Sequence, residues 1–381
     1  MRLLISDNNL HLNFRPLTLT RPISELRFGI LSISESWNLF LDDNKAELFY
    51  ETETYLSDKF QSTENFDIKI AGNVKPNANL AAQILELNEN QSIYNNNKWI
   101  ATKGKKEDSK INVEDDSILY LNNIWDLFQN NDKALQIDFD LLTLNRKSQP
   151  ISSTNQILNP ENIFLEAGAQ VEFSILNASK GPIYIGKNAE VMEGTMIRGG
   201  FALLAHGTVK MGAKIYGATT IGPHCKVGGE ISNCILQAYS NKGHDGFIGN
   251  SIIGEWCNLG ADTNSSNLKN NYGNLRIHSY STNQLEQTDL LFCGVLMGDH
   301  SKTGINTMLN TATTIGVNAN VFGAQFPPKF IPSYSWGGFS DSPKFRLEKA
   351  FEVGENMMKR RNLSLTKMDR NILTFISDNN L

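Results

Sequence analysis

The polar run NKGHDGFIGN, residues 241–250, contains the residue with the clearest chemical potential, His244. An imidazole, with an ordinary pKa near ~6.5, can accept a proton at neutral pH and so can serve as a general base. A developing oxyanion would then need donors, which backbone N–H groups at glycine corners or the Asn267 amide could supply. The alternative is a solvated loop histidine without a chemical role.

Branched aliphatic residues recur every six positions through the second half of the chain. This period indicates the fold that carries His244. Neither a helix of period 3.6 nor a strand of period 2 keeps such a series on one face, whereas a three-sided solenoid of short strands and tight corners does. The sequence therefore predicts a parallel β-helix of hexapeptide repeats. The series comprises Ile185, Val191, Ile197, Leu203, Val209, Ile215, Ile221 and Val227, then Ile253 and Leu259, then Met297, Thr303, Leu309, Ile315 and Val321.

The series is interrupted between Val227 and Ile253 and again between Leu259 and Met297. Insertions in a solenoid map to protruding loops that often carry a binding site. We expect both interruptions to be such loops, with His244 in the first, outside the prism.

Histidine and cysteine residues between the aliphatic positions of the repeat are candidate metal ligands. His206 and His224 lie eighteen residues apart, one coil in a three-sided solenoid, so their rings should stack ~4.8 Å apart. Such a pair could ligate zinc, although no third histidine has the matching spacing, and a plain stack is the alternative. Cys225 and Cys257 occupy the small-residue position of the repeat and are expected to pack at corners.

Three segments follow from these patterns. Residues 1–150 lack the six-residue period and mix short apolar strands with helical segments, which predicts an α/β domain. Residues 151–330 carry the repeats. Residues 331–381 form a helical tail, with Asp341 or Ser342 expected to cap one helix and Thr366 with Asp369 to start another.

Composition narrows the possible partners. The chain has 381 residues, a net charge of −5 and 20% charged residues, which argues against nucleic acid as the main ligand. No apolar stretch approaches the ~20 residues of a membrane span, and Asp7 interrupts the opening segment before a signal-peptide core could form. We therefore expect a cytoplasmic protein that contacts neither membrane nor nucleic acid.

Several longer strings carry a specific family resemblance. GHDGFIGNSIIGEWCNLGADTNSSN, residues 243–267, resembles the acetyltransferase site of the GlmU-like family, which joins glucosamine-1-phosphate acetylation to N-acetylglucosamine-1-phosphate uridylyl transfer. RPLTLTRPISELRFGIL, EVMEGTMIRGG, KMGAKIYGATTIGP and FIPSYSWGG follow the order of a GlmU-like family along nearly the whole chain. The resemblance implies a left-handed β-helix, acetyl-CoA as co-substrate, a sugar phosphate as substrate and a homotrimer.

The resemblance also assigns roles to residues. His244 stands where the family keeps its general base, Asn258 where an asparagine meets the sugar phosphate, and Asn267 where an asparagine faces the thioester. Phe247 replaces a tyrosine of the family pattern. The basic residues that grip the phosphate have no clear match, so phosphate binding is expected from some of Lys214, Lys242, Lys226, Arg198 and Lys269.

The amino-terminal segment resembles a sugar nucleotidyltransferase that has lost a key feature. Arg15 begins an RPLT segment and Arg21 begins an RP segment, and such enzymes place segments of this kind near the nucleotide phosphates. The preceding segment DNNLHLNF, however, contains no glycine. Backbone N–H groups can approach phosphates closely only where side chains are absent, so we expect weak or absent nucleotidyl transfer. Asp7 and Asp126 could hold Mg²⁺ for a nucleoside triphosphate, or could simply cap a turn and a helix.

The sequence leaves three functions open. The first is acetyl-CoA-dependent N-acetylation of an amino-sugar 1-phosphate, for nucleotide-sugar and cell-envelope precursor synthesis. The second is a sugar-1-phosphate nucleotidyltransferase whose β-helix only assembles subunits. The third is a zinc enzyme that hydrates carbon dioxide.

Overall fold

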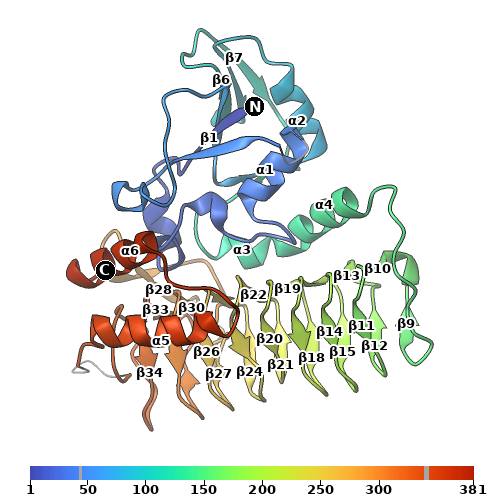
Figure 1. The fold of residues 1–381 in the computed structure, drawn as a ribbon, viewed down its shortest axis with the longest axis vertical. Helices are drawn as coiled ribbons and strands as arrows, with labels where there is room; N and C mark the ends of the chain where they lie inside the picture. The colour runs from blue at the N-terminus through green and yellow to red at the C-terminus, as the bar shows by residue number, and fades with distance from the viewer. Residues whose placement is uncertain (43–44, 339–342) are drawn as a thin grey trace.

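A computed structural model describes residues 1–42, 45–338 and 343–381. An α/β domain rests on a long solenoid, and two carboxyl-terminal helices lie beside the solenoid (Figure 1). This architecture confirms the predicted fold class: a nucleotidyltransferase-like α/β domain, a left-handed parallel β-helix and a short helical tail.

The amino-terminal sheet has the strand order β2-β1-β3-β6-β5-β7, with β1 parallel to β2 and β3 and with β6 antiparallel to β3 and β5. Four of the five residues of β1 are buried, which explains its apolar sequence RLLIS. The strands of this domain are β1 (Arg2–Ser6), β2 (Glu47–Glu51), β3 (Ile68–Ala71), β4 (Val74–Lys75), β5 (Gln91–Asn95), β6 (Lys98–Lys103), β7 (Ser109–Val113) and β8 (Leu119–Tyr120).

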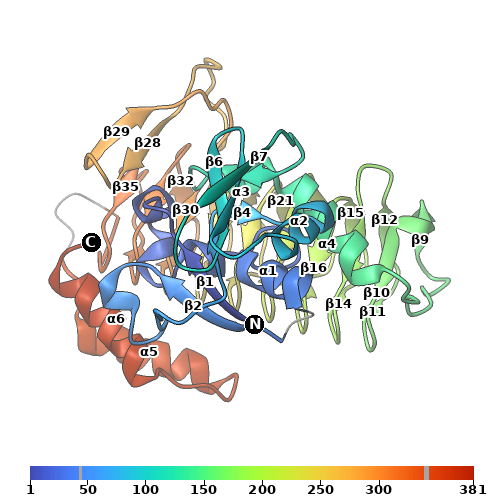
Figure 2. The same ribbon diagram turned by 90° about the horizontal axis from the view of Figure 1, so that it is seen from above.

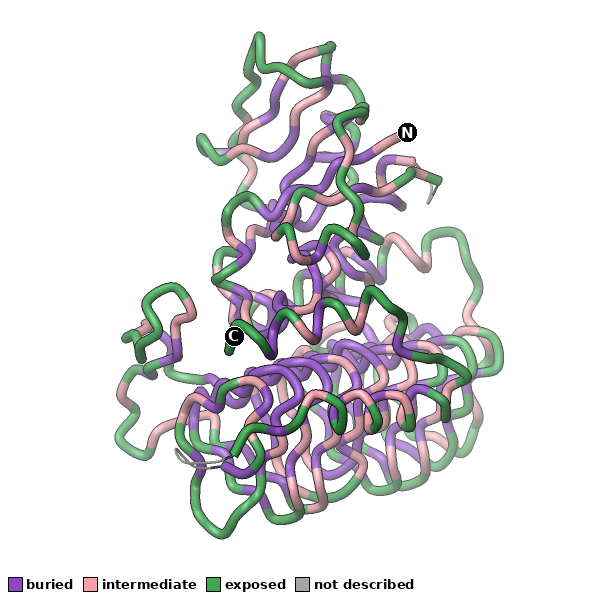
Figure 3. Tube along the Cα trace, turned by 60° about the vertical axis from the view of Figure 1, so that its left-hand side comes forward, coloured by how far each residue is buried: buried purple, intermediate pink, exposed green. Residues whose placement is uncertain are grey.

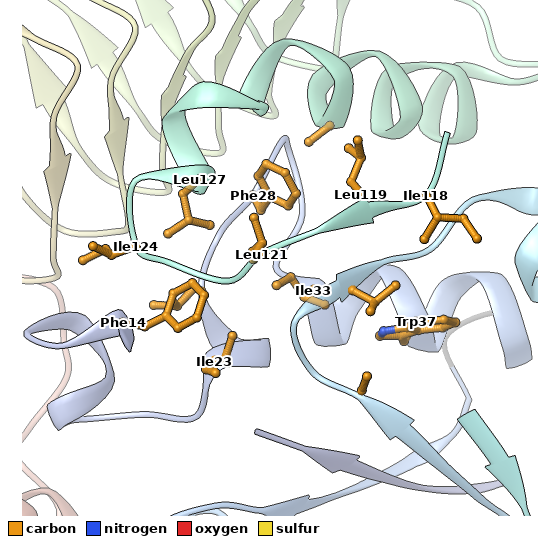
Figure 4. Packing of buried hydrophobic residues seen from close by; sticks show 14 of the residues in the cluster. Phe14, Ile23, Phe28, Ile33, Trp37, Ile118, Leu119, Leu121, Ile124 and Leu127 are labelled. Atoms are coloured by element: carbon orange, nitrogen blue, oxygen red, sulfur yellow. The ribbon is translucent and has the colours of Figure 1, made fainter. Parts of the chain in front are cut away.

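Helices and loops cover this sheet and enclose an aromatic and aliphatic core. Phe14, Phe28 and Trp37 are fully buried in it, and Leu121 and Leu127 complete the layer (Figure 4). Burial of each such side chain contributes roughly 1.5–3 kcal/mol. The helices are α1 (Ile33–Asp42), α2 (Ala78–Leu85), α3 (Asp126–Gln129) and α4 (Asn131–Thr143).

The solenoid has three parallel sheets, and their strands bury apolar side chains in the prism interior. Ile197, Ile215 and Ile231, for example, lie in register on consecutive coils of one sheet. The predicted prism is confirmed, and its mainly aliphatic interior follows the buried track along the coils in Figure 3.

We name the three sheets by what they face. The domain-facing sheet comprises β10 (Ile163–Leu165), β13 (Ile183–Ile185), β16 (Phe201–Leu203), β19 (Thr219–Ile221), β22 (Ile235–Leu236), β25 (Ile252–Ile253), β30 (Leu296–Met297), β33 (Thr314–Ile315) and β35 (Phe330–Ile331). The groove sheet comprises β11 (Gln170–Val171), β14 (Glu190–Val191), β17 (Thr208–Val209), β20 (Lys226–Val227), β23 (Asn241–Lys242), β26 (Asn258–Leu259), β31 (Lys302–Thr303) and β34 (Asn320–Val321). The open sheet comprises β9 (Gln156–Leu158), β12 (Ile175–Asn177), β15 (Met196–Arg198), β18 (Lys214–Tyr216), β21 (Glu230–Ser232) and β24 (Phe247–Gly249), and the pair β27 (Asn264–Ser265) and β32 (Met308–Leu309) lies beyond it.

The two interruptions of the repeat have different structures. Across the first, the coils continue without a protruding loop: β21, β22 and β23 pair with the coils on both sides, and β24 pairs with β21. The prediction of a loop there is wrong, because shorter corners change the phase of the repeat and Lys242 takes an inward position opposite Val227. The second interruption is an excursion that contains the hairpin β28 (Arg276–Ser279) and β29 (Gln284–Gln287), which projects beside the amino-terminal domain (Figure 2).

One corner of the solenoid carries a row of stacked rings from His206, His224, Tyr239, Trp256 and His300. Successive ring centroids are 4.8, 5.1, 4.2 and 6.4 Å apart, and every pair lies within 12° of parallel. The predicted stack of His206 on His224 is therefore confirmed, as part of a longer ladder. Cys225 and Cys257 are fully buried next to this corner, two coils apart, and burial raises the pKa of each thiol to about 12.

The tail consists of α5 (Leu347–Lys359) and α6 (Lys367–Asp378). The predicted start of α6 is confirmed, because the Thr366 hydroxyl accepts from the Asp369 N–H and the Asp369 carboxylate accepts from the Thr366 N–H. The first tail helix begins at Leu347, and the expected caps Asp341 and Ser342 lie outside the described residues.

Polar contacts fix the amino-terminal domain on the solenoid. Arg21 is 8% exposed and pairs with Glu255 at 2.6 Å and with Asp299, while the Thr20 hydroxyl donates to Asp299 at 2.7 Å. Helix α4 packs Leu135 and Phe139 on the domain-facing sheet. The two units therefore share buried polar and apolar contacts.

Candidate functional site

Two adjoining hollows on the groove sheet share Lys226, Asn241 and Asn258 as lining residues. One has a volume of about 380 Å³ and contains His244; the other has a volume of about 440 Å³ and is bounded by helix α5. We call these two hollows together the basic groove. Volumes in this range are typical of sites for small molecules.

Four polar side chains of the groove sheet form a row along the floor of the basic groove, because their strands are paired in register. Lys226, Asn241, Asn258 and Lys302 are paired in sequence across β20, β23, β26 and β31. Each precedes a residue that points into the prism, so each of the four points outward, because successive side chains alternate across a strand. With ~4.8 Å between strands, the four side chains span roughly 14 Å along the sheet.

His244 lies at one end of the basic groove, exposed, at the corner between β23 and β24. Its backbone is held from beneath by Lys242, whose ammonium donates to the His244 carbonyl at 2.6 Å and to the Asp245 carbonyl at 2.7 Å. The corner is therefore fixed while the imidazole remains accessible. Lys210, Asn258 and Ile305 line the same hollow.

Four basic residues surround the other end: Lys226, Lys302, Arg360 and Arg361. No carboxylate lines this hollow within the described ranges. Burial lowers the pKa of Lys302 to about 8, and burial together with Arg361 lowers the pKa of Lys226. The arrangement attracts an anion, because like charges held together without a counter-ion gain stability when one binds.

Two further groups give this end its shape. The Asn241 Oδ1 atom is buried without a hydrogen-bond partner among the described residues, so it can accept from a bound hydroxyl or amine. Tyr239 and Trp256 of the ring ladder form part of the wall. The groove thus combines cations, amide groups and aromatic surface.

The structure groups only some of the predicted substrate residues in this groove. His244, Asn258 and Lys226 line it, whereas Lys214 and Arg198 are exposed on the open sheet. Phe247 lies on β24 of that sheet, and its N–H donates to Asn264 at 2.8 Å. The remaining two lie in the second excursion: the Asn267 amide donates to Asn250 at 2.7 Å, and Lys269 donates to the Asn274 carbonyl.

Lys242 corrects the sequence-based assignment of a phosphate ligand. Its side chain is fully buried inside the prism, and its ammonium is used by two backbone carbonyls. Burial lowers its pKa to about 8. The residue serves as a structural support for the His244 corner, because an inward position cannot reach a ligand on the sheet surface.

The two arginines singled out in the amino-terminal domain have different surroundings. Arg21 is enclosed by Glu255 and Asp299, which raise its pKa against the opposing effect of burial, and the three side chains line a small hollow of about 200 Å³ beside the tail helices. Arg15 lines a separate cavity between the domains.

The carboxylates considered for Mg²⁺ do not fit that ion. Asp7 accepts hydrogen bonds from the Ile23 N–H and the Thr52 hydroxyl and contacts the His11 ring at 2.8 Å, so its oxygens are taken by the protein. Asp126, the first residue of α3, accepts from the N–H groups of Asn122 and Asn123 in the loop before that helix. Throughout the described chain, no group of three His, Cys, Asp or Glu residues is arranged to hold a metal ion.

Sequence reasoning missed Asn241, Lys302 and the tail arginines of the groove. The six-residue period could have revealed Lys302, because it precedes Thr303 as Asn258 precedes Leu259, but it could not reveal Asn241, which lies where the period is interrupted. Arg360 and Arg361 were visible only as the basic end of a helix, and nothing in the sequence indicates which sheet that helix covers.

Comparison with known proteins defines a class for the amino-terminal domain. Residues 3–147 match the family model described as sugar nucleotidyl transferase. That range runs from β1 past the end of α4, so the match ends where the solenoid begins. None of the helices in the described part of the chain has the length and apolar character needed to cross a membrane.

Curated relatives are all proteins named Bifunctional protein GlmU. The chain is 24% identical over 164 residues to that of Synechococcus elongatus, covering 41% of this chain and 32% of the relative. The protein of a Cyanothece species is 20% identical over 224 residues, which cover 53% of this chain and 45% of the relative. The protein of Methanocaldococcus jannaschii is 33% identical over 89 residues, which cover 23% of this chain and 21% of the relative. The first match thus spans about a third of its relative. Together with the family model, these likenesses support a GlmU-like family and a transferase.

Proposed function

We propose that this chain transfers an acetyl group from acetyl-CoA to the amine of an amino-sugar 1-phosphate, such as glucosamine 1-phosphate, in the basic groove. The observation that carries the proposal is the placement of an accessible imidazole, His244, in one hollow with Asn258 and Lys226. The product would enter nucleotide-sugar and cell-envelope precursor synthesis.

The chemistry assigns a task to each residue. The imidazole of His244 takes the proton that the substrate ammonium must lose before nitrogen attacks the thioester carbon. Collapse of the resulting oxyanion breaks the carbon–sulfur bond and releases CoA as thiol. Lys226 and Lys302 balance the substrate phosphate charge, and Asn258 fixes the sugar by hydrogen bonding.

In this scheme Asn267 and Phe247 can contact the substrate only in the groove of a second copy of the chain. Both lie away from the residues that line the groove of their own chain, on or beyond the open sheet. We propose a homotrimer in which the open sheet of one chain faces the groove of its neighbour and completes the site. The residues Leu158, Ile175, Met196 and Tyr216 of that sheet are exposed apolar or aromatic side chains.

The decisive experiment compares two histidine variants in an assay for free CoA. His244→Ala should lower turnover roughly 10²- to 10⁴-fold, the usual contribution of general acid–base catalysis, without altering stability. His224→Ala is the matched control, since it removes an imidazole from the same solenoid but from the ring ladder. Full activity of His244→Ala, or equal losses in both variants, would contradict the proposed base.

A second candidate function is supported by the family model alone. Sugar nucleotidyl transfer would use the amino-terminal domain and would release pyrophosphate from UTP or dTTP. The loop after β1 holds no glycine before Gly29, so close approach of its backbone to phosphates is obstructed. Measuring pyrophosphate and free thiol on one preparation separates the two functions.

A further inference from the structure

The hollow that contains His244 is continued along the solenoid axis by a row of glycine residues. Gly243, Gly260 and Gly304 follow β23, β26 and β31 at the same corner of three consecutive coils. All three are partly exposed, and a Cβ atom on Gly243 would meet nothing within 4 Å. We call this row the glycine trough, because the lack of side chains leaves open space beside the imidazole.

Apolar side chains form the wall of the glycine trough beyond His244. His244, Ala261 and Ile305 occupy the next corner position on the same three coils, and all three line the hollow. Ile305 is 73% exposed, and Phe322, which lies opposite Gly304 on the following coil, is 42% exposed. Both side chains therefore leave apolar surface that a ligand can cover.

The cations of the His244 hollow lie on the other side of the imidazole. Lys226 is one coil before His244 and Lys210 is two coils before it, whereas Ile305 is two coils after it. Lys302, on the coil of Ile305, lines the hollow bounded by α5 and not this one. Among the described residues, no carboxylate lines the His244 hollow. The imidazole thus divides this hollow into a cationic end and an uncharged end.

The spacing of the coils sets the length of the uncharged end. Successive coils are ~4.8 Å apart, so Ile305 lies roughly 10 Å along the solenoid axis from His244. An acetyl group held at the imidazole would occupy less than one coil of this length. A linear acyl chain of about six carbons would extend along the glycine trough as far as Ile305.

We propose that the His244 hollow accepts linear acyl-CoA thioesters of about four to eight carbons in addition to acetyl-CoA, with the acyl chain in the glycine trough against Ala261 and Ile305. The inference rests on the proposed acyl transfer and names the class of its acyl donor. The substrate nitrogen bonds to the thioester carbon, and His244 takes the ammonium proton. The carbon–sulfur bond then breaks, and the CoA sulfur leaves and takes up a proton as thiol.

The release of CoA from acetyl-, butyryl-, hexanoyl- and octanoyl-CoA, with glucosamine 1-phosphate as acceptor, tests this preference. We expect kcat/KM for hexanoyl-CoA to exceed that for acetyl-CoA about 10-fold, because each half-buried methylene contributes about 2-fold and hexanoyl adds four. Ile305→Ser should lower this hexanoyl-to-acetyl ratio about 3- to 10-fold, since the apolar wall loses its largest side chain.

Met211→Ser is the matched control for Ile305→Ser. Met211 is 71% exposed at the same corner, two coils before His244, and does not line the hollow. The hexanoyl-to-acetyl ratio of this variant should equal that of the unmodified protein. An equal fall of the ratio in both variants would contradict a specific contact with Ile305.

Calorimetry of acetyl-CoA and hexanoyl-CoA binding separates this inference from the proposed reaction, because binding does not need turnover. Tighter binding of hexanoyl-CoA that is lost in Ile305→Ser supports the glycine trough, and absence of CoA release from every donor would then contradict only the acyl transfer. Equal affinities for the two donors would overturn the inference. A loss of the same size for both donors in Ile305→Ser would also overturn it, since the pantetheine arm that they share would then contact Ile305.

Discussion

Single residues of the basic groove owe their properties to where the coils place them. Lys302 is half-buried beside Lys226 and the tail arginines, and its ammonium donates within the protein to the His300 carbonyl at 2.6 Å. Burial lowers its pKa from the ordinary lysine value of 10.5 to about 8. A bound anion is attracted by the protonated ammonium of Lys302 and not by its neutral amine. The positive charge of the site therefore changes at a pH slightly above neutral.

Anion binding in the groove should therefore weaken as pH rises from 7 to 9. A lysine with a lowered pKa is protonated below about pH 8 and loses its charge above it, whereas an ordinary lysine would stay charged throughout. We expect the affinity for sulfate, whose own charge is constant over this range, to fall about 3- to 10-fold in calorimetry, since the protonated fraction of a lysine with a pKa of about 8 falls about tenfold between pH 7 and pH 9 and the groove keeps its other cations.

Lys302→Arg is the matched variant for this profile. Arginine stays charged at all these pH values, so the decline should become much shallower. Lys242 also has a pKa of about 8 but lies inside the prism. A profile unchanged in Lys302→Arg would assign the titration to another group.

At the scale of elements, the spacing of the solenoid coils depends on corners where the backbones of successive coils are in contact. A Cβ atom on Gly222 would lie 1.7 Å from the Gln237 carbonyl oxygen on the next coil, whereas a Cβ on Gly243 would meet nothing within 4 Å. Glycine at 222 is therefore a requirement of coil spacing.

Gly222→Ala should destabilise the protein by more than the 1–3 kcal/mol typical of overpacking, because the obstructing atom is backbone. Gly243→Ala, a neighbouring corner with free space, should change stability by less than ~1 kcal/mol. Equilibrium denaturation of both variants checks the difference. Similar stabilities would mean that the coils can separate to admit the methyl group.

The elements also show how far the sequence could be interpreted. The six-residue period predicted the prism and the stack of His206 on His224, because both depend on local repetition. It failed at 228–252, where Lys242 takes an aliphatic position and shorter corners shift the phase without opening a loop. The hollows that hold His244 and Arg15 depend on which elements pack together, and a helix or hairpin carries no local signal for its partner.

At the scale of the whole molecule, buried ion pairs and apolar layers hold the amino-terminal domain on the solenoid. Arg21 should be the strongest single contact, because Asp299 beneath it is 4% exposed and would remain as an unpaired charge. Arg21→Ala should cost about 3–5 kcal/mol, the usual effect of removing one partner of a buried pair.

Arg2→Ala provides the comparison, since Arg2 pairs with Glu47 on an exposed surface and should cost less than ~1 kcal/mol. Denaturant unfolding followed by circular dichroism measures both. Equal costs would show that the interface tolerates a lone Asp299.

The proposed homotrimer is also a property of the whole molecule. The amino-terminal domain and α4 cover the domain-facing sheet, and α5 borders the groove sheet, which leaves the open sheet with its exposed apolar side chains for assembly (Figure 2). Met196→Glu on that sheet should convert a trimer of about 3 × 42.5 kDa into monomers in light scattering. A monomeric wild-type protein would remove the shared-site model.

The ladder of rings along the solenoid corner gives the molecule an optical property of its own. Trp256 and Tyr239 are 2° from parallel at 4.2 Å, close enough for their electronic transitions to couple and to rotate near-ultraviolet polarised light. Because Trp256 also lines the basic groove, a bound ligand changes the surroundings of this coupled pair. The contribution of Trp256 to the fluorescence and near-ultraviolet dichroism of the five tryptophans can therefore report occupancy of the groove in the unlabelled protein.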